Sequence, residues 1–285
     1  VDDAMKLGYN WVKGPFELID DIGPDYLINR LNQEGRPVPE FLQQAAGSSF
    51  YQVAQNQLQT RQFNGGWANT DRPKGVTRFN ELRQTLTPKN SCAVASWFDV
   101  DGIAMVEFHS KANALDSDSM AILADALDQV EAGKMRGLIV HNDAQHFSCG
   151  VNLQAVREYF RREDMDGLDA FLAHFQRTVH QMSQSTAPVV CAPVGMSLGG
   201  GFEVVLHTKQ VICHANSTMG LVESGVGLIP AGGGCKETLY RWHDKLGVQD
   251  VTQADWKAFM NLGYGRTCSS PILARAQAML RNDDR

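Results

Sequence analysis

Apolar and polar positions divide this chain into three stretches with different periods. Over residues 1–47 apolar side chains recur every three or four positions, a spacing typical of amphipathic helices. Gly14-Pro15 and Gly23-Pro24 interrupt the pattern, and proline suits the first turn of the helix that follows a break. The pattern therefore predicts a small all-α segment over residues 1–47.

The second stretch has no clear period. Gln, Asn, Arg and Gly dominate residues 48–91, and the apolar positions are scattered. Such a composition is typical of loops and linkers. We expect residues 48–91 to form an extended polar linker.

From residue 92 onward, short apolar runs alternate with helical patterns. Asp101-Gly102 is a hairpin signal between the first two apolar runs. The pattern predicts strands near 94–98, 103–108, 137–140, 188–194 and 211–213, and helices near 117–130, 151–160, 168–182, 201 and 234–242. Strands alternating with helices favour a mostly parallel sheet, so the predicted fold class is α/β.

Composition narrows the class of protein. With 285 residues, 43% of them hydrophobic, the chain can bury a sizeable core. Its net charge of −6 argues against a nucleic-acid surface, and no apolar run is long enough for a membrane helix. The six cysteines form no C-x-x-C pair and no zinc-ligand spacing. This pattern is typical of reduced thiols, and we expect a cytoplasmic protein without a structural metal.

Two glutamates stand beside glycine-rich turns. One closes the run Gly199-Gly200-Gly201-Phe202-Glu203, and the other, Glu223, follows Gly220-Leu221-Val222. A carboxylate at such a turn can combine proton transfer with free backbone N–H donors. The alternative is structural: a tight turn for the glycines, and a capping or salt-bridged role for Glu223.

A third turn, Phe147-Ser148-Cys149-Gly150-Val151, also lies between an expected strand and an expected helix. It could direct N–H groups at one point, although the motif by itself is better explained as an ordinary strand-to-helix turn. The chain lacks the Walker, Rossmann and Gly-x-Ser-x-Gly patterns, and its histidines have no metal spacing. We interpret Cys149 as a packed thiol rather than a nucleophile.

Taken in order, these motifs resemble the crotonase (enoyl-CoA hydratase/isomerase) family. The similarity covers residues 92–285 and runs through Lys111-Ala112-Asn113-Ala114-Leu115, Phe147 to Asn152, Gly199 to Glu203, and Glu223 with Gly227 to Gly233. It implies a crotonase-like ββα superhelix. The sequence departs from the usual family pattern at Asn152, Phe202, Lys209 and Ala231, which bears on substrate preference.

The resemblance also implies a set of site residues. Glu203 and Glu223 align with the two acid/base glutamates of the hydratases, and the backbone N–H groups of Val151 and Gly200 with the oxyanion hole. Contacts to coenzyme A or substrate are implied for Lys111, Ala114, Leu115, Cys149, Gly150 and Gly199.

A second resemblance concerns the first residues. Asp3 to Tyr9 and Gly14 to Asp20 are similar to the end of the C-terminal helical domain of 3-hydroxyacyl-CoA dehydrogenases. The two units occur fused in β-oxidation enzymes. The resemblance implies a fragment of such a fusion, with residues 92–285 a crotonase-like domain truncated at its C-terminus. NAD would then belong to a dehydrogenase domain outside this chain, and no cofactor is expected within it.

The expected function is hydration of 2-trans-enoyl-CoA to 3-hydroxyacyl-CoA in fatty-acid β-oxidation. One alternative is Δ3-Δ2-enoyl-CoA isomerisation, which needs only one carboxylate. Another is a non-catalytic domain that binds acyl-CoA or docks against the dehydrogenase. Expected partners are the acyl-CoA thioester, the dehydrogenase domain of the same polypeptide and, through the family, further copies of the chain.

Overall fold

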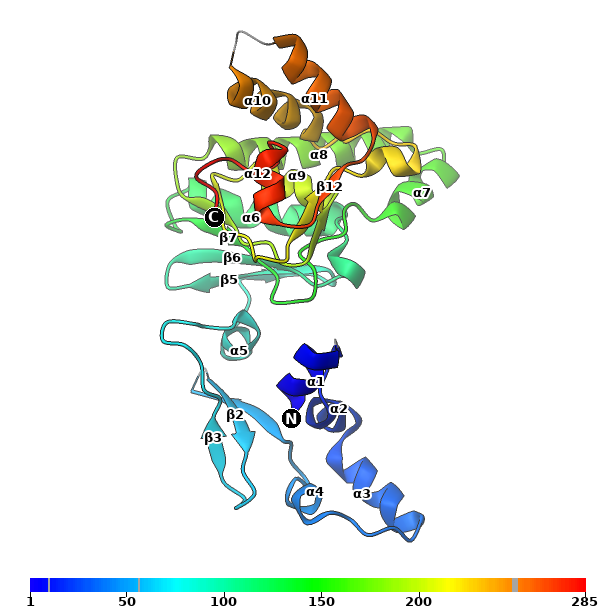
Figure 1. Ribbon diagram of the computed structural model, residues 1–285, viewed down its shortest axis with the longest axis vertical. Helices are drawn as coiled ribbons and strands as arrows, with labels where there is room; N and C mark the ends of the chain where they lie inside the picture. The colour runs from blue at the N-terminus through cyan, green and yellow to red at the C-terminus, as the bar shows by residue number, and fades with distance from the viewer. Residues whose placement is uncertain (10, 56, 248–250) are drawn as a thin grey trace. The chain divides into compact units, whose positions relative to one another are not determined.

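The computed structural model describes residues 1–9, 11–55, 57–247 and 251–285 (Figure 1). The chain forms two compact units, Val1–Thr85 and Leu86–Arg285, which are described separately. Within the described residues, no helix is both long and apolar enough to cross a membrane.

The first unit begins with four short helices, so the helical prediction for residues 1–47 is confirmed. They are α1 (Asp2–Tyr9), α2 (Pro15–Ile22), α3 (Pro24–Gln33) and α4 (Glu40–Gln44). Prolines occupy the first positions of α2 and α3, where a missing N–H costs nothing. A small core of buried side chains joins these helices to the following segment: Ile28, Leu42, Ala45 and Phe50.

Residues 48–91 are not the polar linker that their composition predicted. They contain an antiparallel sheet of β1 (Tyr51–Ala54), β2 (Gln57–Arg61) and β3 (Trp67–Asn69), then α5 (Phe79–Leu82) and the 3₁₀ turn η1 (Arg83–Thr85). The Gln59 side chain accepts a hydrogen bond from the amide of Gln52 at 2.8 Å and donates one to Asn69 at 2.8 Å. Because polar amides pair across this half-buried sheet, no apolar alternation marks its strands.

The second unit is built on a six-stranded sheet in the order β10-β8-β7-β6-β5-β4. Its strands are β4 (Asn90–Ser91), β5 (Ala95–Val100), β6 (Ile103–Phe108), β7 (Leu138–Val140), β8 (Val189–Cys191) and β10 (Gln210–Val211). The hairpin predicted at Asp101-Gly102 joins β5 to β6, and β6, β7, β8 and β10 pair in parallel. The predicted α/β class is confirmed.

A smaller sheet of β9 (Met196–Leu198), β11 (Thr218–Gly220) and β12 (Thr267–Cys268) brings distant glycines together. β9 and β11 run parallel, with Leu198 paired to Gly220. The N–H of Gly199 donates to the Gly220 carbonyl at 3.0 Å. The carboxyl ends of β9 and β11 therefore lie side by side at one edge of this sheet, together with the residues that follow each strand.

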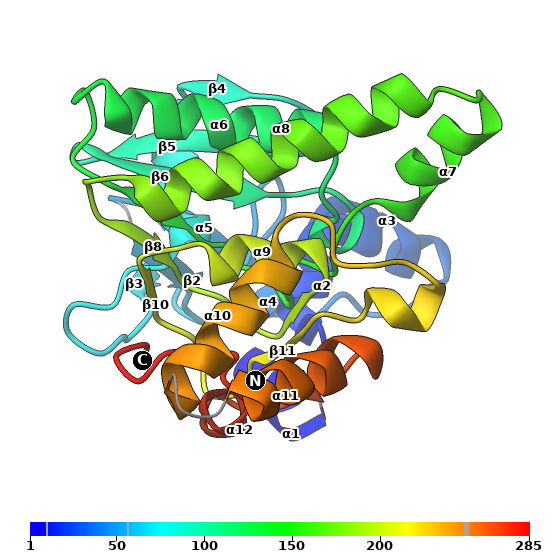
Figure 2. The same cartoon turned by 90° about the horizontal axis from the view of Figure 1, so that it is seen from above.

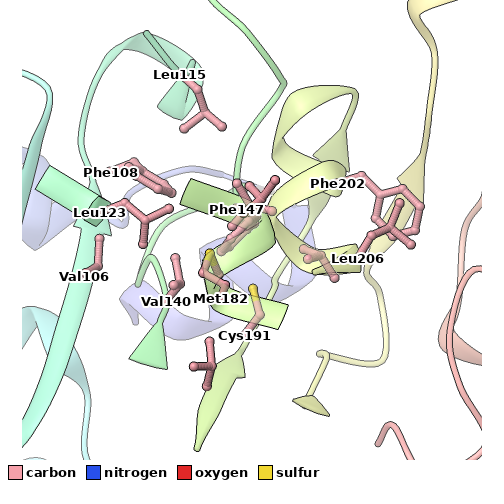
Figure 3. Packing of buried hydrophobic residues seen from close by; sticks show 14 of the residues in the cluster. Val106, Phe108, Leu115, Leu123, Val140, Phe147, Met182, Cys191, Phe202 and Leu206 are labelled. Atoms are coloured by element: carbon pink, nitrogen blue, oxygen red, sulfur yellow. The ribbon is translucent and has the colours of Figure 1, made fainter. Parts of the chain in front are cut away.

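Helices cover the sheets (Figure 2). They are α6 (Ser117–Glu131), α7 (Leu153–Arg161), α8 (Met165–Gln184), α9 (Gly200–Leu206), α10 (Gly234–Leu246), α11 (Val251–Gly263) and α12 (Pro271–Ala276), with 3₁₀ turns η2 (Lys111–Asn113) and η3 (Glu223–Val226). The helix α6 packs on β5, β6 and α8. Figure 3 shows the core between these elements, with Phe147, Val140 and Phe202 among its buried side chains.

Candidate active site

Glu203 lies in the first turn of α9 and is 2% exposed. Its Oε1 accepts a hydrogen bond from the N–H of Gly234 at 2.8 Å. Gly234 is the first residue of α10, so the carboxylate takes the place of a cap at the N-terminus of that helix. A side chain at Gly232 could not be accommodated, because its Cβ would lie 2.4 Å from Oε2 of Glu203.

Glu223 begins η3, three residues after β11 ends. Its Oε2 atom is buried and has no hydrogen-bond partner within the described residues. Gly199 passes close to the same carboxylate: a Cβ there would lie 3.1 Å from Oε1 of Glu223, and its φ of +50° also favours glycine. The glycine thus lets the backbone approach the carboxylate.

Burial changes the proton affinity of both carboxyl groups. Desolvation raises the pKa of Glu203 to about 7, with a further upward contribution from Glu223, while the N–H groups of Gly234 and Gly232 act in the opposite direction. Desolvation also raises the pKa of Glu223. Two neighbouring carboxyl groups that both have raised pKa values can share one proton near neutral pH.

Two backbone N–H groups lie beside these carboxyl groups. Neither the N–H of Val151 nor that of Gly200 donates a hydrogen bond to another described residue. They are close neighbours, because a Cβ on Gly200 would lie 3.4 Å from the nitrogen of Val151. A Cβ on Gly150, where φ is +102°, would lie 3.0 Å from the carbonyl oxygen of Leu198. Glycines at 150 and 200 therefore allow the two turns to approach.

All of these groups line one cavity of about 230 Å³. Its wall is largely apolar, with side chains from α7, α8 and the turn after η3. Among the described residues, the only ionisable groups in the wall are two carboxyls and a thiol. The full lining is Cys149, Gly150, Val151, Leu153, Val156, Phe160, Leu168, Phe171, Leu172, Phe175, Gly199, Gly200, Glu203, Val222, Glu223, Val226, Leu228, Ile229, Ala231 and Gly232.

Comparison with known proteins decides the family. Residues 99–254 match the family described as enoyl-CoA hydratase/isomerase. The chain belongs to the enoyl-CoA hydratase/isomerase family. The match covers more than half of the sequence and includes every group that lines the cavity.

Similar proteins include curated relatives that are much longer than this chain, and solved structures. A "Probable 3-hydroxyacyl-CoA dehydrogenase" of Bacillus subtilis (strain 168) is 33% identical over 100% of this chain and 36% of its own length. A "Putative fatty acid oxidation complex trifunctional enzyme" of Rickettsia felis is 27% identical over 85% of this chain and 31% of its own length. The chain thus spans about a third of these two relatives.

A solved structure described as an enoyl-CoA hydratase of Geobacillus kaustophilus HTA426 shares the fold. It has a TM-score of 0.57 and 20% identity over 67% of this chain and 68% of that one. At this identity the likeness supports the crotonase-like fold.

The residues expected from the crotonase pattern fall into two groups. Glu203, Glu223, Val151 and Gly200, with Cys149, Gly150 and Gly199, all line the cavity. Lys111, Ala114 and Leu115 do not. Burial raises the pKa of the Cys149 thiol, which agrees with a packed thiol rather than a nucleophile.

Leu115 does not have the surface position that a contact to coenzyme A requires. Its side chain is fully buried in the core (Figure 3), and both of its backbone groups are used. Its N–H donates to the Gly150 carbonyl at 2.9 Å and its carbonyl accepts from Asn152 at 2.7 Å. Leu115 therefore braces the turn that presents the Val151 N–H. Sequence spacing could not distinguish this role from a ligand contact.

Three residues that sequence reasoning did not assign to the site also border it. Gly232 and Gly234 surround the Glu203 carboxylate, and Phe175 of α8 forms part of the wall. The run Gly232-Gly233-Gly234 was a usable signal, because three consecutive glycines suggest a close approach. No signal of this kind marks Phe175, which follows the ordinary spacing of an amphipathic helix.

Metal binding has no support in this site. Within the described residues, no three or more His, Cys, Asp or Glu side chains are grouped so that they could hold a metal ion. The N–H groups of Val151 and Gly200 are neighbouring donors beside the two carboxyl groups, and donors arranged in this way can stabilise negative charge on an oxygen atom.

Proposed function

We propose that residues 86–285 form an enoyl-CoA hydratase domain that adds water to a 2-trans-enoyl-CoA. One observation carries the proposal: the buried carboxyl group of Glu203, the half-buried carboxyl group of Glu223 and two unpartnered N–H groups line the same apolar cavity. An isomerase requires one such carboxyl group, whereas hydration uses two, one for each proton transfer.

Each of these groups has a task in the proposed reaction. The N–H groups of Val151 and Gly200 donate hydrogen bonds to the thioester oxygen and stabilise the enolate that forms on it. One of Glu203 and Glu223 takes a proton from water as its oxygen bonds to Cβ of the substrate. The other, protonated, delivers a proton to Cα. The raised pKa of Glu203, about 7, allows a protonated carboxyl group to persist at neutral pH.

The apolar wall of the cavity favours a substrate whose acyl group is apolar. Phe160, Phe171 and Phe175 line it together with aliphatic side chains, and no Lys or Arg of the described part of the chain belongs to the lining. An acyl group carrying a second carboxylate would meet two glutamates and no cation there. Lys111 and Ala114, outside this lining, remain candidate contacts for the coenzyme A portion.

We further propose that the chain is part of a larger dehydrogenase-hydratase polypeptide. The Bacillus subtilis relative matches the full length of this chain, including the helices of the first unit. Residues 1–47 would then be the end of a dehydrogenase helical domain, and the dehydrogenase domain of the same polypeptide would be the partner. Binding of NAD would reside there rather than in this chain.

Absorbance of the enoyl thioester provides the test. We expect this chain to consume 2-trans-enoyl-CoA and to form 3-hydroxyacyl-CoA, and both Glu203→Gln and Glu223→Gln to lose that activity. Glu131→Gln, on the exposed end of α6, is a matched control that should keep it.

Two other outcomes identify the alternatives. Conversion of 3-enoyl-CoA to 2-enoyl-CoA, with no hydration, would identify an isomerase. Acyl-CoA binding without turnover would contradict the hydratase and favour a non-catalytic binding domain.

A further inference from the structure

His207 is the residue that caps the C-terminus of α9, one helical turn after Glu203, and it is 1% exposed. Its Nδ1 is 2.7 Å from the backbone carbonyl oxygen of Glu203. Because a carbonyl oxygen only accepts hydrogen bonds, Nδ1 carries a proton and donates it to this contact. The imidazole is thereby tied to the backbone of the residue whose carboxylate lines the cavity.

The ring also supports the glycine turn before α10. Gly233 has φ of +106°, and a Cβ there would lie 2.8 Å from both Cε1 and Nε2 of His207. On either side, a Cβ at Gly232 would lie 2.4 Å from Oε2 of Glu203, and one at Gly234 2.9 Å from Oε1. The turn is therefore packed against two side chains, the carboxylate of Glu203 in α9 and the imidazole of His207 at the end of that helix.

Charged groups around the ring come from α10. Oε1 of Glu237 is 3.7 Å from Nε2, and Lys236 and Arg241 also act on the ring electrostatically. Burial lowers the pKa of His207, with Lys236 and Arg241 acting in the same direction and Glu203 and Glu237 opposing it. At neutral pH the ring is therefore neutral, and its contact with Glu237 is not an ion pair.

We propose that His207 is a positioning residue for Glu203: its ring supports the backbone at Gly233 and so keeps the Gly234 N–H on the Glu203 carboxylate. This proposal rests on the proposed function in that Glu203 is taken as a proton-transfer group. His207 touches neither the cavity nor a reacting atom, and it acts through the turn.

The test measures the titration of Glu203 without substrate, so it does not depend on whether the chain is a hydratase. The carboxyl carbon of Glu203 is followed by NMR in protein with ¹³C-labelled glutamate, and the Glu203→Gln spectrum identifies its signal. His207→Asn keeps a donor near the position of Nδ1 but removes the outer part of the ring. With the Gly234 hydrogen bond weakened, we expect the Glu203 midpoint to move up by about one pH unit.

Two matched variants separate positioning from general destabilisation. His207→Phe keeps a flat ring beneath Gly233 and should retain the wild-type midpoint. Val205→Ala removes buried volume from the same helix, away from the turn, and should also leave the midpoint unchanged. In an active protein, the pH dependence of kcat should shift in His207→Asn in the same direction as the NMR midpoint.

An unchanged midpoint in folded His207→Asn, or a raised one in His207→Phe, would overturn the proposal. If His207→Asn does not fold, amide exchange in the wild-type chain supplies the test. The Gly234 amide should then exchange as slowly as amides of the buried strand β7, and rapid exchange would show that the turn is not held.

Discussion

The two units of this chain each bury a carboxylate near a helix N-terminus, and they use it differently. In the first unit, Asp2 is 3% exposed and accepts hydrogen bonds from Phe16 N–H at 3.1 Å, Glu17 N–H at 2.9 Å and the Tyr51 hydroxyl at 2.9 Å. In the second unit, Glu203 is as buried but accepts one close bond, and Oε2 of Glu223 has no partner within the described residues.

This difference separates structural carboxylates from candidate catalytic ones. Asp2 faces donors on all sides and holds the start of α2 against β1. Glu203 and Glu223 keep unused acceptor positions and face a cavity. Because an unsatisfied buried charge is costly, such an arrangement is retained only where the spare acceptors have a use. Burial alone would not have distinguished the two units.

The largest predicted effect tests this distinction through turnover. Glu203→Gln keeps the shape and an acceptor for the Gly234 N–H but cannot exchange a proton. We expect hydration of 2-enoyl-CoA to fall by roughly 10³-fold, because general acid–base catalysis contributes about that much. Affinity for acyl-CoA, measured by calorimetry, should change little. Asp2→Ala, which removes an equally buried carboxylate, should leave kcat unchanged, and a loss in both variants would contradict the comparison.

The sequence alone pointed to the two candidate catalytic glutamates, for a physical reason. Glu203 and Glu223 each follow a glycine run, and glycine runs are conspicuous because they cost conformational entropy. The strands and helices predicted for the second unit formed near their expected positions, as did the hairpin at Asp101-Gly102, whereas β4, β9, β11, β12, α11 and α12 were not predicted. Local signals of this kind require no knowledge of the tertiary fold.

Other features depend on contacts between distant residues. Gly234 reaches Glu203 across 31 positions, and His207 reaches Gly233 through the same fold. The sequence predicts a ligand contact for Leu115, whereas the structure buries its side chain in the core. The sheet within residues 48–91 was missed because its cross-strand pairs, such as Gln52 with Gln59, are polar. Each of these features depends on a contact between residues that are separated in the sequence, and no local sequence pattern specifies such a contact.

The free energy of unfolding of the second unit should depend on pH. Glu203 has a pKa of about 7 when folded and an ordinary value of 4.5. The folded state therefore binds more protons than the unfolded state between these values, and the free energy of unfolding falls as pH rises from 4.5 to 7. A shift of this size corresponds to about 3 kcal/mol. Urea unfolding of the second unit at pH 5 and pH 8 should show the fall.

Glu203→Gln supplies the control for this pH effect, because glutamine does not titrate. The variant should lose most of the decline and be more stable than the wild type at pH 8. Burial also raises the pKa of Glu223, so a smaller decline of the same sign should remain. An equal decline in both proteins would show that Glu203 is not its source.

Asp2→Ala should act on the first unit. It leaves two backbone N–H groups of α2 and the Tyr51 hydroxyl without their acceptor, and the loss of such a cap costs about 2 kcal/mol. Amide exchange should report faster opening of β1 and β2, while β6 and β7 exchange as in the wild type. Faster exchange in both units would contradict a role confined to the first.

The smallest effect is expected from Tyr51→Phe, which removes one of the three donors to Asp2 and leaves the two N–H groups in place. The net cost of one hydrogen bond is about 1 kcal/mol, so this variant should open β1 and β2 less often than Asp2→Ala does. The double variant tests whether both changes act through the same bond: once Asp2 is alanine, Tyr51→Phe should cost almost nothing more. Full additivity would mean that Tyr51 stabilises the unit through its ring rather than its hydroxyl. Asp2 would then be held by two donors, still twice the single close bond at Glu203.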